Sequence, residues 1–169
     1  MTDDLRIRRA AETDDGQLAA ITYDTWSPQT ATRPLPDAAE PFFGAHTGVT
    51  VSSTLVAFLP EAVAGFVALS PAPASNGLWA VHEIAVAPLL QRRGVGFALV
   101  RAAVAAALSA GAVELSAHVP AGDTAVGRLM LRSGFTATSA SARPSGNHDG
   151  SADPSRPVTM VRTPLRRTT

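Results

Sequence analysis

The stretch that decides the fold is Val86-Ala87-Pro88-Leu89-Leu90-Gln91-Arg92-Arg93-Gly94-Val95-Gly96-Phe97. A β-rich run ends at its proline, and two glycines then open an apolar run with helical spacing. The first N–H groups of a helix lack internal partners and carry partial positive charge. Gly94 and Gly96 let a ligand approach that backbone closely, and Arg92 and Arg93 add full charges. We predict an anion cradle suited to a pyrophosphate; the alternative is a helix start with two convenient glycines.

The motif does not by itself fix the phosphate ligand. A dinucleotide fingerprint needs G-x-G-x-x-G/A directly after its strand, but Leu99 stands at the third glycine position and several residues intervene. Glu114 lies about where a ribose-binding acid would stand, which is weak support alone. A Walker loop needs a lysine, and all fourteen basic residues of this chain are arginine.

Periodicity on both sides of this stretch predicts an alternating α/β chain. Asp14 followed by Gln17 is typical of a capping box, which would start a helix that ends before Pro28. A bulge would be natural at Gly65. The predicted strands are 5–10, 55–59, 63–70, 78–87, 113–119, one from 135 and 158–163, and the later helices are 95–110 and 124–133. The order is β-α-(α)-β-β-β-α-β-α-β-β.

Composition bounds the function classes. The chain has 169 residues, no cysteine and a net charge of zero, so disulfides and cysteine nucleophiles are excluded and phosphate-driven nucleic-acid binding is disfavoured. The absence of lysine excludes Schiff-base chemistry. No run is long and apolar enough to span a membrane, and the acidic N-terminus is unlike a signal peptide, so we expect a cytoplasmic protein. No spacing among the four histidines indicates a metal site.

The sequence around the cradle resembles a known family. Gln91–Gly96 resembles the Q/R-x-x-G-x-G/A loop of the GCN5-related N-acetyltransferases, and the resemblance extends to Ile84–Pro88 before it and Leu131–Phe135 after it. It implies an α/β (α+β) fold with a mixed, mostly antiparallel central sheet and helices on both faces. It also implies a splayed strand pair, here Leu78–Ala87 and Val113–Val119. We expect a single N-acetyltransferase domain, 1–169, with its core in 5–136 and 157–165 and a flexible loop at 139–157.

The resemblance implies acetyl-CoA as the cofactor. Splaying leaves one strand edge unpaired, so that the edge can hydrogen-bond the pantetheine arm as an added strand would. By this analogy the arm contacts Ile84, Ala85 and Val86, and the pyrophosphate contacts Gln91, Arg92, Arg93, Gly94, Val95, Gly96 and Phe97. The Val86 N–H is then the expected oxyanion donor. Asp123 stands where the family commonly has Asn; it can cap a helix equally well but can only accept from the pantetheine amides.

Three side chains compete as the catalytic base. Family members often carry an acid at the position of Glu83, and a carboxylate in a central strand is unusual, although pairing with an arginine would also explain it. His82 and His118 are rivals because the ordinary histidine pKa suits proton transfer. Successive strand residues face opposite ways, so His82 and Glu83 are not expected to face the acceptor together.

The chain departs from the family at the position of the tyrosine that protonates the leaving thiolate, where Met130 stands. Either no protein acid acts, or another group such as Ser133 does. Tyr23, Trp26, Phe42 and Phe43 could line the acceptor pocket, or merely pack the core. The expected reaction is acetyl transfer to a primary amine of a small molecule or peptide by direct attack. The alternative is a non-catalytic acetyl-CoA-binding sensor or partner protein. Dimerisation is common in the family, so a homodimer is possible.

Overall fold

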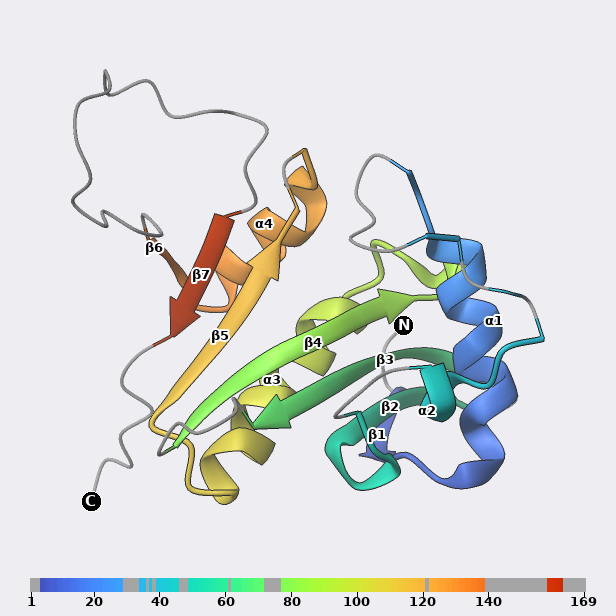
Figure 1. Cartoon of the computed structure of the whole chain (residues 1–169). Helices are drawn as coiled ribbons and strands as arrows, with labels where there is room; N and C mark the ends of the chain where they lie inside the picture. The colour runs from blue at the N-terminus through green and yellow to red at the C-terminus, as the bar shows by residue number, and fades with distance from the viewer. Residues whose placement is uncertain are drawn as a thin grey trace.

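Seven strands form one sheet in the computed structural model, in the order β1-β2-β3-β4-β5-β7-β6 (Figure 1). The strands are β1 (Arg6–Arg9), β2 (Thr54–Leu59), β3 (Ala62–Pro71), β4 (Leu78–Val86), β5 (Glu114–Val119), β6 (Thr136–Thr138) and β7 (Val158–Arg162). Every neighbouring pair is antiparallel except β4 and β5. The mixed, mostly antiparallel sheet and the element order predicted from the sequence are confirmed.

The structure describes residues 4–28, 34–35, 37, 39–45, 49–60, 62–71, 77–120, 122–138 and 158–162. The loop predicted at 139–157 lies outside these residues. No helix in the described ranges is both long enough and apolar enough to cross a membrane.

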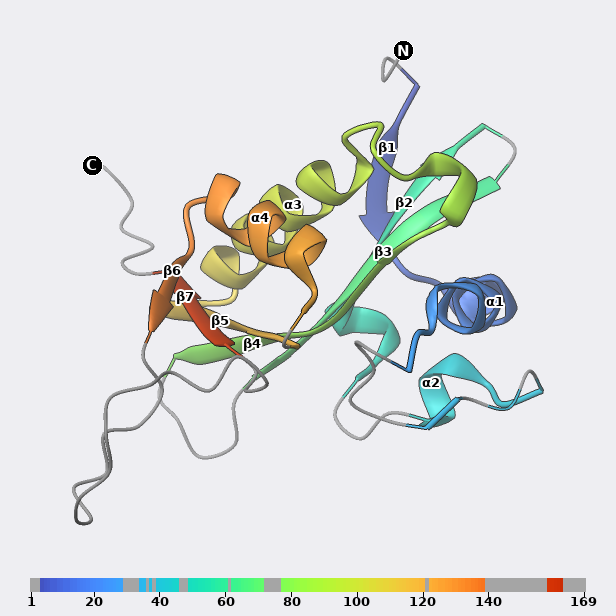
Figure 2. The ribbon, with the colours of Figure 1, turned by 90° about the horizontal axis from the view of Figure 1, so that it is seen from above.

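Helices cover both faces of the sheet (Figure 2). They are α1 (Asp15–Thr25), α2 (Phe42–Ala45), α3 (Val95–Ser109) and α4 (Thr124–Arg132). One core lies under α3 and α4, where Leu99, Val100 and Ala103 of α3 are fully buried. A second core lies under α1 and α2, where Leu18 and Phe42 pack on the sheet. Each fully buried leucine contributes about 1.5–3 kcal/mol, so the two cores hold the sheet and α3 as a firm platform.

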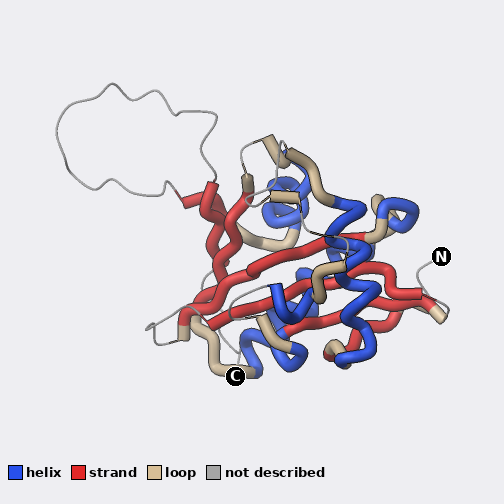
Figure 3. The backbone as a smooth tube through the Cα atoms, turned by 45° about the vertical axis from the view of Figure 1, so that its right-hand side comes forward, coloured by secondary structure: helices blue, strands red, loops and turns tan. Residues whose placement is uncertain are grey.

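The parallel pair β4 and β5 stays together over four residues and then diverges. Leu78 pairs with Glu114 and the ladder stops at the Val81–Ala117 pair. Among the described residues, no strand pairs with this side of β4 from His82 to Val86, whereas β5 continues along β7. Figures 1 and 3 show β5 and β7 leaving β4 at an angle. The expected splayed strand pair is therefore present. The gap between the strands, which we call the splay, begins after the Val81–Ala117 pair and opens toward the end of the sheet where β4 ends.

β4 contains an extra residue at His82. Ala68 of β3 pairs with Glu83 and its neighbour Leu69 pairs with Val81, so His82 is the extra residue in the register. Such a β-bulge shifts the alternation of side chains by one residue. Val81 and Ile84 pack in the core under α3, whereas Glu83 contacts α1 on the other face. The bulge breaks the strict alternation from which the relative orientation of His82 and Glu83 was predicted.

A second register shift, between Ala57 and Phe58, places an extra residue, Ala64, in β3. It lies one position before Gly65, where the bulge was expected. Gly65 serves a close approach: a Cβ there would lie 2.5 Å from the carbonyl oxygen of Ala85 and 3.0 Å from Cα of Val86. Only glycine lets β3 pass this near to the end of β4.

α1 begins next to Asp14 as predicted, but not through a capping box. The Asp14 carboxylate makes no cap hydrogen bond to α1; it accepts from Arg8 at 2.6 and 2.8 Å and from the Ala11 N–H at 2.7 Å. The side chain of Gln17 accepts instead from the Val63 N–H, at 3.3 Å. The hydrogen bond from Arg8 lowers the pKa of the buried Asp14 carboxyl, with help from the Ala11 N–H. Asp14 thus ties the start of α1 to β1.

Candidate active site

The turn between β4 and α3 has the backbone that an anion cradle requires. Gly94 is the residue before α3 and has φ of 85°, and a Cβ there would meet nothing within 4 Å. Glycine is therefore needed for the left-handed conformation and not for space. Arg92 has φ of 63°, and it is the only residue other than glycine with a positive φ within the described ranges. Backbone strain of this kind is common at functional sites. The first N–H groups of α3, which lack partners within the helix, follow directly after this turn.

Side chains of this turn divide into anchors and exposed groups. Gln91, Arg92 and Arg93 are exposed, whereas Val95 is 4% exposed and sits in the core. A Cβ on Gly96 would lie 3.2 Å from Cδ2 of Leu129 in α4. The predicted cradle thus has two exposed guanidinium-bearing side chains at its rim and a buried valine beneath it. Gly96 lets α4 pack against the first turn of α3.

The free edge of β4 offers backbone groups from alternate residues. The Ala87 N–H donates to the Ala64 carbonyl at 2.9 Å, so Ala87 and, two residues earlier, Ala85 direct their backbone groups to β3. Ile84 and Val86 therefore direct theirs into the splay. The Val86 carbonyl accepts from the Gln91 side chain at 3.1 Å, which ties the cradle to this edge. Ala85 is turned away, with its side chain 8% exposed in the core under α1.

Glu83 lies on the α1 face of β4, half-buried, beside the splay. Its Oε1 accepts a hydrogen bond from Oγ1 of Thr22 in α1 at 3.2 Å. The bulge at His82 brings the carboxylate to this face. Neither the bulge nor Thr22 was anticipated from the sequence, although a threonine beside Leu18 and Ile21 in the buried stripe of α1 was a visible signal.

The two histidines considered as rival bases are both exposed. His118 is the neighbour of the buried Ala117 and Val119, so it faces away from the α3 core and shares the α1 side of the sheet with Glu83. Its Nδ1 lies 3.4 Å from Oγ1 of Thr159 in β7. His118 therefore borders the splay from the β5 side, and His82 occupies the bulge.

Polar groups on α4 are already engaged in holding that helix. Asp123 caps it as predicted, accepting from the Val126 N–H at 3.0 Å. The Ser133 hydroxyl donates to the Leu129 carbonyl at 2.8 Å and the residue is 6% exposed. Met130 is 1% exposed in the core. The hydroxyl proton of Ser133 is therefore used in a hydrogen bond within α4, and this geometry gives no support to Ser133 acting as an acid.

The aromatic residues considered for the acceptor side lie at different depths. Phe42 is 2% exposed and packs edge-on against Phe66, with ring centroids 4.8 Å apart. Phe42 belongs to the core, and we do not assign it to the acceptor pocket. Phe43 and Trp26 are half-buried, and Tyr23 is 42% exposed on α1.

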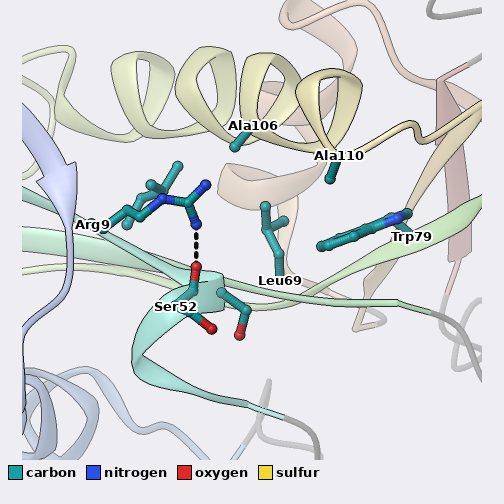
Figure 4. Close-up of a pocket in the computed structure, with 8 residues that line it drawn as sticks. Arg9, Ser52, Leu69, Trp79, Ala106 and Ala110 are labelled. Atoms are coloured by element: carbon teal, nitrogen blue, oxygen red, sulfur yellow. Dashed lines mark hydrogen bonds between the residues drawn. The ribbon is translucent and has the colours of Figure 1, made fainter.

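A separate cavity of about 220 Å³ lies at the other end of α3 (Figure 4). Ala106 and Ala110 roof it, and Leu69 and Trp79 form its floor. Arg9 is its one charged lining residue and donates to the Ser52 carbonyl. Trp79 is at the start of β4, so the cavity is remote from the splay. Small residues on α3 leave this gap, and it is not the candidate site.

Comparisons with known proteins agree with this geometry. The family model described as the acetyltransferase (GNAT) family matches residues 17–135, so the chain belongs to that family, whose enzymes use acetyl-CoA. No curated protein matches the chain by sequence.

Similar solved structures include YncA from Salmonella typhimurium, solved with its cofactor acetyl-CoA (TM-score 0.69, 18% identity, 95% of this chain and 94% of that one). The ribosomal-protein-S18-alanine N-acetyltransferase from Escherichia coli has a TM-score of 0.63 and 18% identity over 98% and 96% of the chains. Nourseothricin acetyltransferase has a TM-score of 0.62 and 26% identity over 96% and 99%. The first two likenesses concern the fold alone.

Proposed function

We propose that this protein transfers the acetyl group of acetyl-CoA to a primary amine of a small molecule or peptide by direct attack. One observation carries the proposal. The splay between β4 and β5 opens at the same end of the sheet as the Gly94 turn and the start of α3. An unpaired strand edge for an amide-bearing arm therefore lies beside a cradle for a diphosphate.

We assign the binding of acetyl-CoA, the acetyl donor, mainly to backbone groups of β4 and α3. Ile84 and Val86 would pair with the pantetheine arm, and the N–H groups of the first turn of α3, with Arg92 and Arg93, would hold the pyrophosphate. The left-handed turn at Gly94 fits this role because it directs consecutive N–H groups to one side. Asp123 keeps one carboxylate oxygen for its helix cap, and the other can accept from a pantetheine amide.

The reacting end lies where β4 ends. Acetyl-CoA supplies an activated carbonyl carbon and a thiolate leaving group. The Val86 N–H points into the splay and would stabilise the charge that develops on the acetyl oxygen. A primary amine of ordinary pKa, about 10.4, must lose a proton before attack, and Glu83 would accept it, directly or through one water. With Met130 buried and Ser133 engaged, the thiolate, of ordinary pKa about 8.5, leaves without a protein acid.

The acceptor would approach from the α1 face, where Glu83 lies and where Tyr23 and Trp26 offer aromatic surface. Amines bind well against aromatic faces once they are partly desolvated. Similar proteins carry both kinds of acceptor in their names, a ribosomal-protein alanine in one and nourseothricin in another. The use of acetyl-CoA fits the cytoplasmic location expected from the sequence.

A second candidate is a non-catalytic acetyl-CoA sensor, which the buried Met130 at the usual tyrosine position favours. Thiol release from acetyl-CoA with a panel of amines separates the two functions. The enzyme proposal expects amine-dependent release that falls roughly 10²–10⁴-fold in Glu83→Gln, with acetyl-CoA affinity retained. Glu114→Gln, at the closed end of the splay, is the matched control and should keep wild-type turnover. Tight acetyl-CoA binding with no amine-dependent release would favour the sensor.

A further inference from the structure

A threonine of α1 reaches the carboxylate that we assign as the base. Thr22 is 6% exposed, and its hydroxyl donates to Oε1 of Glu83 across the interface between α1 and β4, at 3.2 Å. This hydrogen bond links a helix on the acceptor side to the strand that borders the splay. It is thus placed to decide how the Glu83 carboxylate is held.

Comparison with a neighbouring threonine of α1 shows that the hydrogen bond from Thr22 to Glu83 is not the usual one for a threonine in a helix. A threonine within a helix commonly turns its hydroxyl back to the carbonyl four residues earlier. Thr25 does so, donating to the Ile21 carbonyl at 2.7 Å. Thr22 sits in the same helix and instead donates to Glu83. If packing alone mattered, a valine of similar shape would fill this buried position without the cost of burying a hydroxyl.

We propose that Thr22 is a positioning residue that holds the Glu83 carboxylate in one rotamer, so that this carboxylate receives the proton of the acceptor amine. The proposal rests on the proposed function of Glu83. A hydrogen bond donated to a carboxylate favours its ionised form, and a fixed rotamer removes the need to reorganise the base in each turnover.

Several titratable groups lie on β4 and on the elements that border Glu83, and they would share in any pH profile. They are His82 beside it on β4, Tyr23 and Asp24 on α1, and His118 across the splay on β5. The residue that pairs with Glu83 on β3 is Ala68, which does not titrate. A direct measurement at the Glu83 carboxyl is therefore needed beside the pH dependence of turnover.

The test compares Thr22→Val, which removes the hydroxyl, with Thr22→Ser, which keeps it, and with Thr25→Val as the matched control. The readouts are the Glu83 carboxyl pKa by ¹³C NMR titration and the pH profile of kcat/KM. In Thr22→Val we expect that pKa to rise, because the ionised form loses a donor. We expect kcat to fall about three- to tenfold while the acetyl-CoA Kd stays unchanged. Thr22→Ser should restore both, and Thr25→Val should alter neither.

The outcomes separate this inference from the proposed function. If the Glu83 pKa and kcat in Thr22→Val both match wild type while Glu83→Gln is inactive, the positioning role is overturned and the base remains. If Glu83→Gln turns over like wild type, both roles are overturned, even where Thr22→Val still moves the carboxyl pKa. Retained acetyl-CoA affinity shows that a variant is folded, and Thr22→Ser supplies a second folded comparison.

Discussion

Gly94 gives the sharpest test of the cradle, because its backbone demand and its surroundings can be separated. Its φ is 85° and a Cβ would meet nothing within 4 Å, so Gly94→Ala adds conformational strain without a steric clash. A left-handed conformation costs a residue with a Cβ roughly 1–2 kcal/mol. For a protein of this size that corresponds to a fall in Tm of about 2–8 °C.

Gly111 provides a matched control at the far end of the same helix. It also has φ of 85° and open space around a Cβ, and it follows the C-terminus of α3. Gly111→Ala should lower Tm by a similar amount. Only Gly94→Ala should also weaken acetyl-CoA binding, by about ten- to a hundredfold, since a relaxed turn misdirects one or two N–H donors to a charged group.

Differential scanning fluorimetry and isothermal titration calorimetry with acetyl-CoA make the comparison. The reasoning is refuted if both variants lose stability equally and Gly94→Ala still binds acetyl-CoA with the wild-type Kd. It is also refuted if Gly111→Ala weakens binding as much as Gly94→Ala does, because the effect would then be a general consequence of destabilising α3.

Three further predictions follow from other contacts. Arg93→Ala should weaken acetyl-CoA binding about tenfold at low salt and less at high salt, measured by calorimetry at two ionic strengths; an unchanged Kd would remove this guanidinium from the site. Wild-type stability should fall as pH drops below about 4, because the pKa of Asp14 is lowered in the folded state and its contribution is lost only under acid conditions. Asp14→Asn should lower Tm at pH 7 and flatten that acid limb in thermal melts, and an unaltered limb would contradict this origin. Met130→Ala should cost about 2–5 kcal/mol in chemical denaturation because Met130 is 1% exposed, and a loss under 1 kcal/mol would contradict its place in the core.

Local sequence patterns were enough to predict the order of the helices and strands in this protein. The turn before α3 could be predicted because a proline ends the strand before Gly94 and an apolar stripe follows it, and both signals are confined to one short segment. The cap at Asp123 was predicted for the same reason, since its partner, the Val126 N–H, is three residues away. The splay followed from resemblance, not from periodicity, because no pattern within β4 records where β5 leaves it.

The failures of sequence reasoning involve partners far along the chain. The bulge at His82 depends on how β4 pairs with β3, so the face that Glu83 occupies could not be deduced from β4 alone. The carboxylate of Asp14 had a suitable cap spacing, but Arg8 on β1 competes for it more strongly. The sequence left open whether Phe42 lines the acceptor pocket or packs the core, and its contact with Phe66, from the middle of the sheet, decides for the core. Each of these outcomes is decided by tertiary contacts that a local window does not contain.

A crystal structure of the acetyl-CoA complex tests the assignment of the donor site most directly. We predict diphosphate oxygens within hydrogen-bond distance of the N–H groups of Val95 and Gly96, and the pantetheine arm paired with Ile84 and Val86. A complex in which the diphosphate lies elsewhere, or in which the arm leaves the edge of β4 unpaired, would contradict the account.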